Sequence, residues 1–205
     1  MMKKPFNERF RILITWFFAA GMFGFIAVSQ PGWEYYPVFE EFLFMMASLL
    51  AGIGALGRAW CAIFIVGRKD GTLVRLGPYA TCRNPLYFFS FLGAIGIGLA
   101  TETIFMPCCI AIAFSCYYPF IIRNEEKRLR LLFGEGFEDY QREVPCFFPK
   151  FSLLKGNEPK DYPVCTKTVR HCLCEALWFV WLIGIIELLA AFREVGCLPT
   201  CWLIY

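Results

Sequence analysis

The chain has 205 residues, of which 58% are hydrophobic, 19% aromatic and only 18% charged, with a mean hydropathy of +0.53. A soluble domain is about 45–50% apolar and about 25% charged, so this composition excludes a disordered chain and most soluble enzymes. The net charge of +3 is too small to indicate a nucleic-acid partner, and long apolar runs predict an all-α, polytopic membrane protein.

Five apolar runs follow one another, and a membrane-spanning helix needs about 20 such residues. The runs cover Ile12–Ser29, Val38–Val66, Leu86–Ala100, Ile104–Ile122 and Ala176–Phe192. The second is longer than one span, so we expect it to leave the hydrocarbon near Arg58 and continue as an interfacial helix. The third is short, and Gly93, Gly96 and Gly98 within it indicate close packing or a break. We therefore predict a helical bundle of about five membrane-spanning helices.

Most of the lysines and arginines lie on one side of these runs. They precede the first run, occur between the second and third, and recur between the fourth and fifth, whereas segments 30–37 and 101–103 contain none. Basic residues mark the cytoplasmic loops of membrane proteins. We predict a multi-pass protein whose amino terminus, 67–85 loop and 123–175 segment are cytoplasmic.

Two polar blocks separate the spans on that side. The first, 67–87, is rich in glycine and proline and predicts a loop leading into a helix, with Pro85 in its first turn. The second, 123–149, has apolar residues at helical spacing and predicts an amphipathic helix broken near Gly134–Gly136. The third and fourth spans form an antiparallel hairpin with a very short turn, so we expect their polar ends to meet.

This hairpin would place Arg83, Asn84 and Tyr87 beside Glu125 and Glu126 in a polar cleft at the membrane surface. Carboxylates there could bind a cation or a ribose, an arginine could bind a carboxylate, and aromatic rings could stack on a base or a sulfonium. In the alternative interpretation, these charges only solvate a helix end and anchor it among the lipid headgroups.

The two blocks also resemble the signatures of a known group of enzymes. Gly-Pro-Tyr-x3-Arg-Asn-Pro-x-Tyr, at 77–87, resembles the Gly-x-Tyr-x3-Arg-His-Pro-x-Tyr signature of membrane-embedded methyltransferases. Glu-Glu-x2-Leu-x3-Phe-Gly-x2-Phe-x2-Tyr-x3-Val-Pro-x3-Pro, at 125–149, resembles their carboxy-terminal signature. These are the isoprenylcysteine carboxyl methyltransferases and their phospholipid methyltransferase relatives, and the resemblance covers roughly residues 55–150.

The resemblance implies a helical membrane enzyme with a cytoplasmic cleft for S-adenosylmethionine and a lipid-facing opening for a membrane lipid or lipid-modified acceptor. The cofactor-binding residues carried over are Tyr79, Arg83, Asn84, Tyr87, Glu125, Glu126 and Tyr140, and the catalytic ones are Arg83, Glu125 and Glu126. A carboxylate acceptor needs no base, whereas an amine must lose a proton, for which Glu125 or Glu126 would be the base.

The sequence departs from the family pattern at two places. The family histidine is Asn84 here, and an amide forms hydrogen bonds but does not titrate near neutrality. Phe88 and Phe89 replace a pair of small residues, which we expect to narrow the pocket. Two alternatives stay open: a membrane reductase of related architecture that uses NADPH, and a degenerate member that binds lipid or scaffolds a complex without catalysis.

The tail lies outside this resemblance. We interpret 1–150 as the methyltransferase-like domain and 151–205 as a polar linker followed by an additional membrane helix. Cys165, His171, Cys172 and Cys174 precede that helix, but their spacing fits no zinc pattern, and we expect no metal site. Glu187 lies within the last apolar run, and we expect it to be protonated or paired with a polar group.

Overall fold

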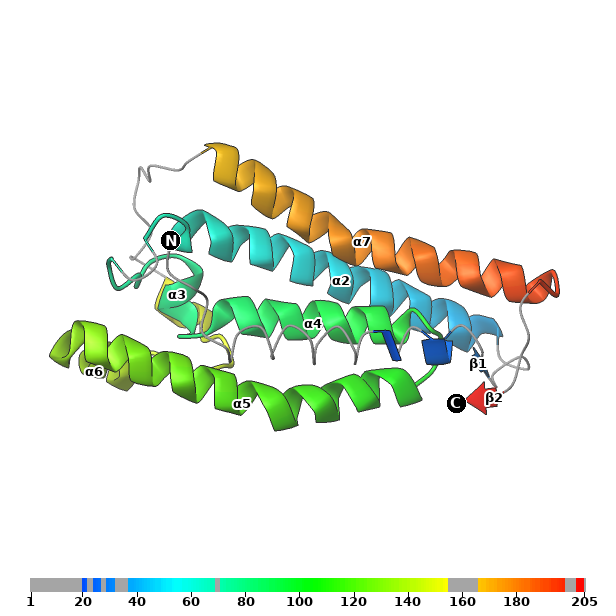
Figure 1. Ribbon diagram of the computed structural model, residues 1–205, viewed down its shortest axis with the longest axis horizontal. Coiled ribbons are helices and arrows are strands. Elements are labelled where there is room, and N and C mark those ends of the chain that lie inside the picture. Colours follow the sequence, from blue (N-terminus) through cyan, green and yellow to red (C-terminus); the bar gives the residue numbers. More distant parts are fainter. Residues whose placement is uncertain are drawn as a thin grey trace.

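The computed structural model describes residues 20–21, 24–26, 29–31, 37–68, 71–154, 166–197 and 202–204. Four of its helices lie side by side in the order α7, α2, α4, α5 (Figure 1). These are α2 (Pro37–Ile65), α4 (Pro85–Leu99), α5 (Phe105–Phe133) and α7 (Thr166–Glu194). The short elements are α3 (Pro78–Thr81), α6 (Glu135–Glu143), the 3-10 helix η1 (Phe151–Leu154) and the parallel strands β1 (Ser29–Pro31) and β2 (Trp202–Ile204).

The predicted helical membrane bundle is confirmed. Three helices of the described part are long and apolar enough to cross a membrane, namely Val38–Ile65, Phe105–Phe133 and Cys172–Arg193, and Pro85–Leu99 is a shorter apolar helix. These four correspond to the second to fifth apolar runs of the sequence. The first run, Ile12–Ser29, falls mostly outside the described residues.

The second run forms one helix, α2, which continues unbroken past Arg58, and the interfacial position of its last turns stays a prediction. Arg58 Nη1 donates a hydrogen bond to Ser90 Oγ on α4, and its Cζ lies 5.8 Å from the centre of the Phe179 ring on α7. Polar and aromatic partners of this kind stabilise a cation inside a bundle. Arg58 is therefore stabilised by contacts with both α4 and α7.

Glycines hold α2 and α4 together backbone to backbone. A Cβ added to Gly54 would lie 2.6 Å from Gly93 Cα, and one added to Gly96 would lie 2.7 Å from the backbone nitrogen of Ala51. A Cβ on Gly93 would also overlap the ring of Phe179, which α7 inserts at this point. The close packing predicted for the glycines of the third run is confirmed.

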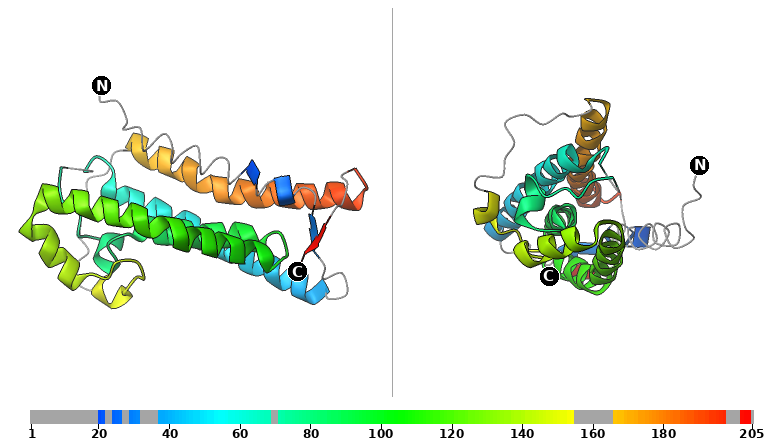
Figure 2. Two further views of the ribbon diagram at one scale, coloured as in Figure 1. Left: turned by 60° about the horizontal axis from the view of Figure 1, so that its bottom comes forward. Right: turned by 90° about the vertical axis from the view of Figure 1, so that its left-hand side faces the viewer.

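One continuous helix, α5, contains both the fourth apolar run and the start of the amphipathic block. Its 29 residues span about 43 Å, more than the roughly 30 Å of a hydrocarbon core. Gly134, with a φ of 51°, ends α5, and α6 then turns back beside it (Figure 2). We call α3, α6, η1 and the loops at 71–77 and 144–150 the polar lobe, which lies at one end of the bundle.

Candidate active site

Both sequence motifs meet where the polar lobe joins the bundle. They line a cavity of about 200 Å³, which we call the motif cavity. The predicted site residues on its wall are Tyr79, Arg83, Asn84, Tyr87, Glu125 and Tyr140. Glu126, the remaining predicted residue, lies outside this lining. It accepts hydrogen bonds from two residues of the wall, Arg83 and Asn84. The hairpin of α4 and α5 therefore brings together the residues that the sequence grouped.

Arg83, just before α4, forms hydrogen bonds to α5, to α6 and to the residue that follows α6. Its Nε donates to Glu126 Oε1 at 2.8 Å, and its Nη1 donates to the carbonyl oxygens of Gln141 and Val144 at 2.9 and 2.8 Å. The Arg83 and Glu126 side chains are only 10% and 15% exposed. Breaking such a buried pair by removing one partner costs about 3–5 kcal/mol. Arg83 therefore fixes the start of α4 to α5 and to the end of α6.

The amide of Asn84 stands where the family has histidine. Its Nδ2 donates to the Cys146 carbonyl oxygen at 3.0 Å and lies 3.3 Å from Glu126 Oε1. Cys146 Sγ lies 3.6 Å from the same carboxylate oxygen. Burial and the neighbouring Glu126 carboxylate raise the pKa of the Cys146 thiol, so the thiol stays protonated and acts as a donor. Glu126 Oε1 thus accepts from three side chains of this chain.

Glu125 has a different environment from its neighbour. Its Oε2 accepts a hydrogen bond from the Tyr87 hydroxyl at 2.8 Å, and the residue lines the motif cavity. Arg128, three residues later on α5, lines the same cavity. The sequence did not single out Arg128 as a site residue. Its spacing of three from Glu125 could have indicated it, because residues three apart share one face of a helix.

Two buried tyrosines are hydrogen-bonded to each other within the polar lobe. The Tyr140 hydroxyl donates to the Tyr79 carbonyl oxygen at 2.6 Å, and the two residues are 2% and 8% exposed. Burial raises the pKa of both phenols, so each remains neutral and protonated. These residues form walls of the cavity, as the sequence suggested for the cleft.

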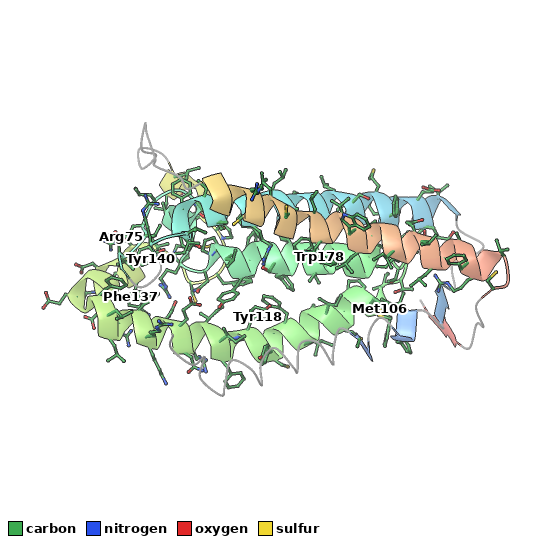
Figure 3. The ribbon with its side chains drawn as sticks, turned by 45° about the horizontal axis from the view of Figure 1, so that its top comes forward. Arg75, Met106, Tyr118, Phe137, Tyr140 and Trp178 are labelled. Carbon is green, nitrogen blue, oxygen red and sulfur yellow. The ribbon has the colours of Figure 1, made fainter. Side chains whose placement is uncertain are left out.

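Aromatic rings fill the space between α4 and α5 beside the motif cavity. The Tyr87 ring packs edge-on against Tyr118 at 5.3 Å, and Tyr118 stacks on Phe114 with ring centroids 3.5 Å apart. Figure 3 shows Tyr118 between the two helices. We call the whole group the aromatic seam: Tyr87, Phe88, Phe91, Phe114, Tyr118 and Phe147. The sequence indicated Tyr87 and Phe88, but not Phe91 or the rings contributed by α5 and the 144–150 loop.

Comparisons with known proteins identify the family of this chain. The phospholipid methyltransferase family model matches residues 42–136. The chain is 34% identical over 188 residues to the cobalt-zinc-cadmium resistance protein CzcN of Cupriavidus metallidurans, an alignment that covers 92% of this chain and 83% of that protein. The chain belongs to the family of CzcN, within the superfamily of integral membrane methyltransferases. Every predicted site residue except Tyr140 lies in the region that the family model matches.

Two further relatives extend this comparison. The nickel-cobalt-cadmium resistance protein NccN of Alcaligenes xylosoxydans xylosoxydans is 38% identical over 148 residues, 72% of this chain and 68% of that protein. The protein-S-isoprenylcysteine O-methyltransferase of Mus musculus is 35% identical over 88 residues, 42% of this chain and 29% of that enzyme. No solved structure matches the chain significantly.

The cysteine and histidine group before the last helix is only partly described. Cys165 and the side chain of His171 lie outside the described residues. Within the part of the chain that the structure describes, no group of three or more His, Cys, Asp or Glu residues is arranged to hold a metal ion.

Proposed function

We propose that this chain transfers a methyl group from S-adenosylmethionine to a lipid-soluble acceptor at the cytoplasmic face of the membrane. The observation that carries the proposal is the motif cavity, in which the residues of both motifs face one space. Its chemistry suits this cofactor, because a carboxylate binds hydroxyl and ammonium groups, a guanidinium binds a carboxylate, and aromatic rings attract a sulfonium.

In this proposal the two adjacent glutamates have separate roles. Glu125 and Tyr87, which are on the cavity wall, contact the cofactor. Glu126 is a positioning residue, because its Oε1 is engaged by Arg83, Asn84 and Cys146. When bound, S-adenosylmethionine would supply an electrophilic methyl group for transfer to the acceptor. The protein contributes alignment, which can lower a barrier by about 7–11 kcal/mol.

The aromatic seam supports a lipid-soluble acceptor. Its rings extend from Tyr87, which is bonded to Glu125, through the space between α4 and α5. An apolar chain can pack against such rings without leaving polar groups unpaired. A carboxylate acceptor reacts in its ionised form. An amine acceptor must first lose a proton, and Glu125 is the carboxylate on the cavity wall that can accept it.

The positive-inside pattern supports a cytoplasmic polar lobe. The loop at 67–85 and the segment 123–175 hold many of the basic residues of the chain. In this orientation the motif cavity is reached by a water-soluble cofactor from the cytoplasm, while the acceptor stays in the bilayer.

The names of two relatives suggest a biological setting. CzcN and NccN, which align with most of this chain, are both named for resistance to cobalt and cadmium, together with zinc or nickel. We propose that methylation of a membrane component by this chain contributes to such resistance. A strain that lacks the gene should regain its tolerance of cadmium with the wild-type chain, but not with the Glu125→Gln variant.

Binding of S-adenosylmethionine and of NADPH to the detergent-purified protein tests the cofactor directly. We expect S-adenosylmethionine to bind and NADPH not to bind. Glu125→Gln removes a charge from the cavity wall at almost constant volume and should weaken binding by about tenfold or more, because hydrogen bonds to charged groups contribute about 1.5–3 kcal/mol. Glu135→Gln changes an exposed carboxylate of α6 and should leave the affinity unchanged.

The other outcomes select the alternatives. Binding of NADPH alone would indicate a membrane reductase of related architecture. Binding of neither cofactor would indicate a non-catalytic protein that binds lipid or scaffolds a complex. Equal loss of affinity in Glu125→Gln and Glu135→Gln would contradict the proposal that Glu125 contacts the cofactor.

A further inference from the structure

A second cavity, of about 220 Å³, lies in the polar lobe. It is lined by Arg75, Ala80, Tyr140, Glu143, Val144 and Leu153. Of these residues, only Tyr140 also lines the motif cavity. No role in the proposed methyl transfer uses this cavity, and Arg75 is the single basic residue among the described residues of its wall.

Arg75 is held over the ring of Tyr140, with its Cζ 5.2 Å from the ring centroid (Figure 3). A guanidinium that stacks through its face keeps its N–H groups at the edge available for hydrogen bonds. Among the described residues, Arg75 makes no hydrogen bond, and the nearest carboxylate oxygen, Oε2 of Glu143, is 3.8 Å from Nη2. Nη2 itself is buried, whereas the Arg75 side chain as a whole is 38% exposed.

Hydrogen bonds within the polar lobe connect the elements around this cavity. The Tyr140 hydroxyl donates to the Tyr79 carbonyl oxygen at 2.6 Å, and the Val144 N–H donates to the Tyr140 carbonyl oxygen at 3.0 Å. The Lys150 N–H donates to the Thr81 carbonyl oxygen at 2.9 Å and joins η1 to α3. Walls that are already ordered reduce the entropy lost when a ligand binds.

We propose that this cavity binds a phosphate group through Arg75. The planar guanidinium fork matches the oxygens of a phosphate, and bonds between the two are charge-assisted. The phosphate comes from an anionic lipid headgroup or from free phosphate, since both are found at a membrane surface.

Glu143 is the group that opposes this binding. Its carboxylate repels a phosphate near Arg75, but its side chain is 70% exposed and can turn toward water. The proposal therefore makes two predictions of opposite sign. Loss of the Arg75 charge weakens phosphate binding, and loss of the Glu143 charge strengthens it.

The test uses the full chain in phosphatidylcholine nanodiscs and follows its thermal unfolding. In one arm inorganic phosphate is added against chloride at equal ionic strength. In the other, phosphatidic acid replaces part of the phosphatidylcholine in phosphate-free buffer. A ligand of the folded state raises the midpoint as its concentration passes its dissociation constant. We expect the midpoint of the wild-type protein to rise in at least one arm, and that arm identifies the source of the phosphate.

Three variants decide whether the effect belongs to this cavity. Arg75→Gln should weaken the effect about tenfold or more in ligand concentration. Glu143→Gln should reach the same midpoint shift at a lower concentration. Arg142→Gln, a control on the same helix whose side chain is 75% exposed and pairs with Asp139, should behave as wild type. No shift in either arm, an equal shift in Arg75→Gln, or weaker binding by Glu143→Gln would overturn the proposal.

Discussion

The two sides of α4 are packed in opposite ways. Toward α2, glycines bring the two backbones into direct contact at Gly54 and Gly93. Toward α5, the contact is made by the rings of the aromatic seam, such as Phe91 against Phe114 with centroids 4.7 Å apart. Both interfaces join apolar helices, so hydrophobicity does not explain the difference. The size of the contacting side chains explains it, since glycines meet on one side and aromatic rings on the other.

This difference indicates which interface can open. Backbones in contact leave no side chain that could rotate away, so the interface between α2 and α4 is rigid. Rings can change rotamer while their helices stay in place. The motif cavity lies at the end of the second interface, beside the turn-rich loop and α6. The arrangement combines a fixed scaffold on one side of α4 with an adjustable approach to the site on the other.

Adding one methyl group to the rigid interface should have the largest effect. In Gly54→Ala the new Cβ meets the backbone of Gly93, and overpacking of this kind costs about 1–3 kcal/mol. Gly52→Ala makes the same change two residues away on α2, where nothing lies within 4 Å of the added atom. We expect the first variant to lower the free energy of unfolding in detergent and the second to leave it unchanged or slightly raised. Equal stability of the two variants would contradict backbone contact between α2 and α4.

The helices and the convergence of the motifs could be predicted from the sequence. Apolar length sets the spans, and a three-residue turn after Ala100 forces the third and fourth runs into a hairpin. Arg83 and Glu126 therefore come together, as the bond between them shows. The contacts of Arg58 with Ser90 and Phe179 were not predictable, because these partners come from distant parts of the chain.

The different environments of the two glutamates also could not be predicted from the sequence. Glu125 and Glu126 are neighbours in one motif, but successive residues of a helix point about 100° apart. Glu125 therefore lines the motif cavity, and Glu126 accepts a hydrogen bond from Arg83. Which direction faces the cavity depends on the rotation of α5 about its axis. Packing against α4 through the aromatic seam sets that rotation, and no local pattern encodes it.

Removing a ring should loosen the adjustable interface and open it to molecules in the bilayer. Phe114 contacts Phe91, Tyr118 and Phe147, and Phe147 follows Cys146 in the chain. We expect Phe114→Ala to admit a lipophilic maleimide from the bilayer and to raise the labelling of Cys146 severalfold, measured by peptide mass spectrometry.

Phe120→Ala is the matched control for this experiment. Phe120 lies on the same helix but is 64% exposed and is outside the aromatic seam, so its removal should leave the labelling of Cys146 unchanged. The raised pKa of the Cys146 thiol slows the reaction in all three proteins and does not affect the comparison. Equal labelling of Cys146 in both variants would show that the aromatic seam does not control access from the bilayer.

The smallest effect concerns the turn that joins α4 to α5 at the far end of the aromatic seam. Burial raises the pKa of Glu102 from 4.5 to about 7, and the carboxylates of Glu40, Glu187 and Glu41 raise it further than Arg193 lowers it. Between about pH 4.5 and 7 the folded protein therefore holds a proton that the unfolded chain has released. Protonation of Glu102 favours the folded state, so its contribution is present at low pH and is lost as the pH rises through 7.

The full shift corresponds to about 3 kcal/mol, and solvent screening of a half-buried group reduces this to about 1 kcal/mol. We expect the thermal midpoint of the wild-type protein to fall between about pH 5 and pH 8 by more than that of Glu102→Gln, which cannot ionise. The polar amide keeps the size of the side chain, so any change in slope reports the proton. Identical slopes would mean that the carboxyl of Glu102 is hydrated in the folded protein. In that case the turn would be open to water, and the adjustable interface would extend along the whole length of α4.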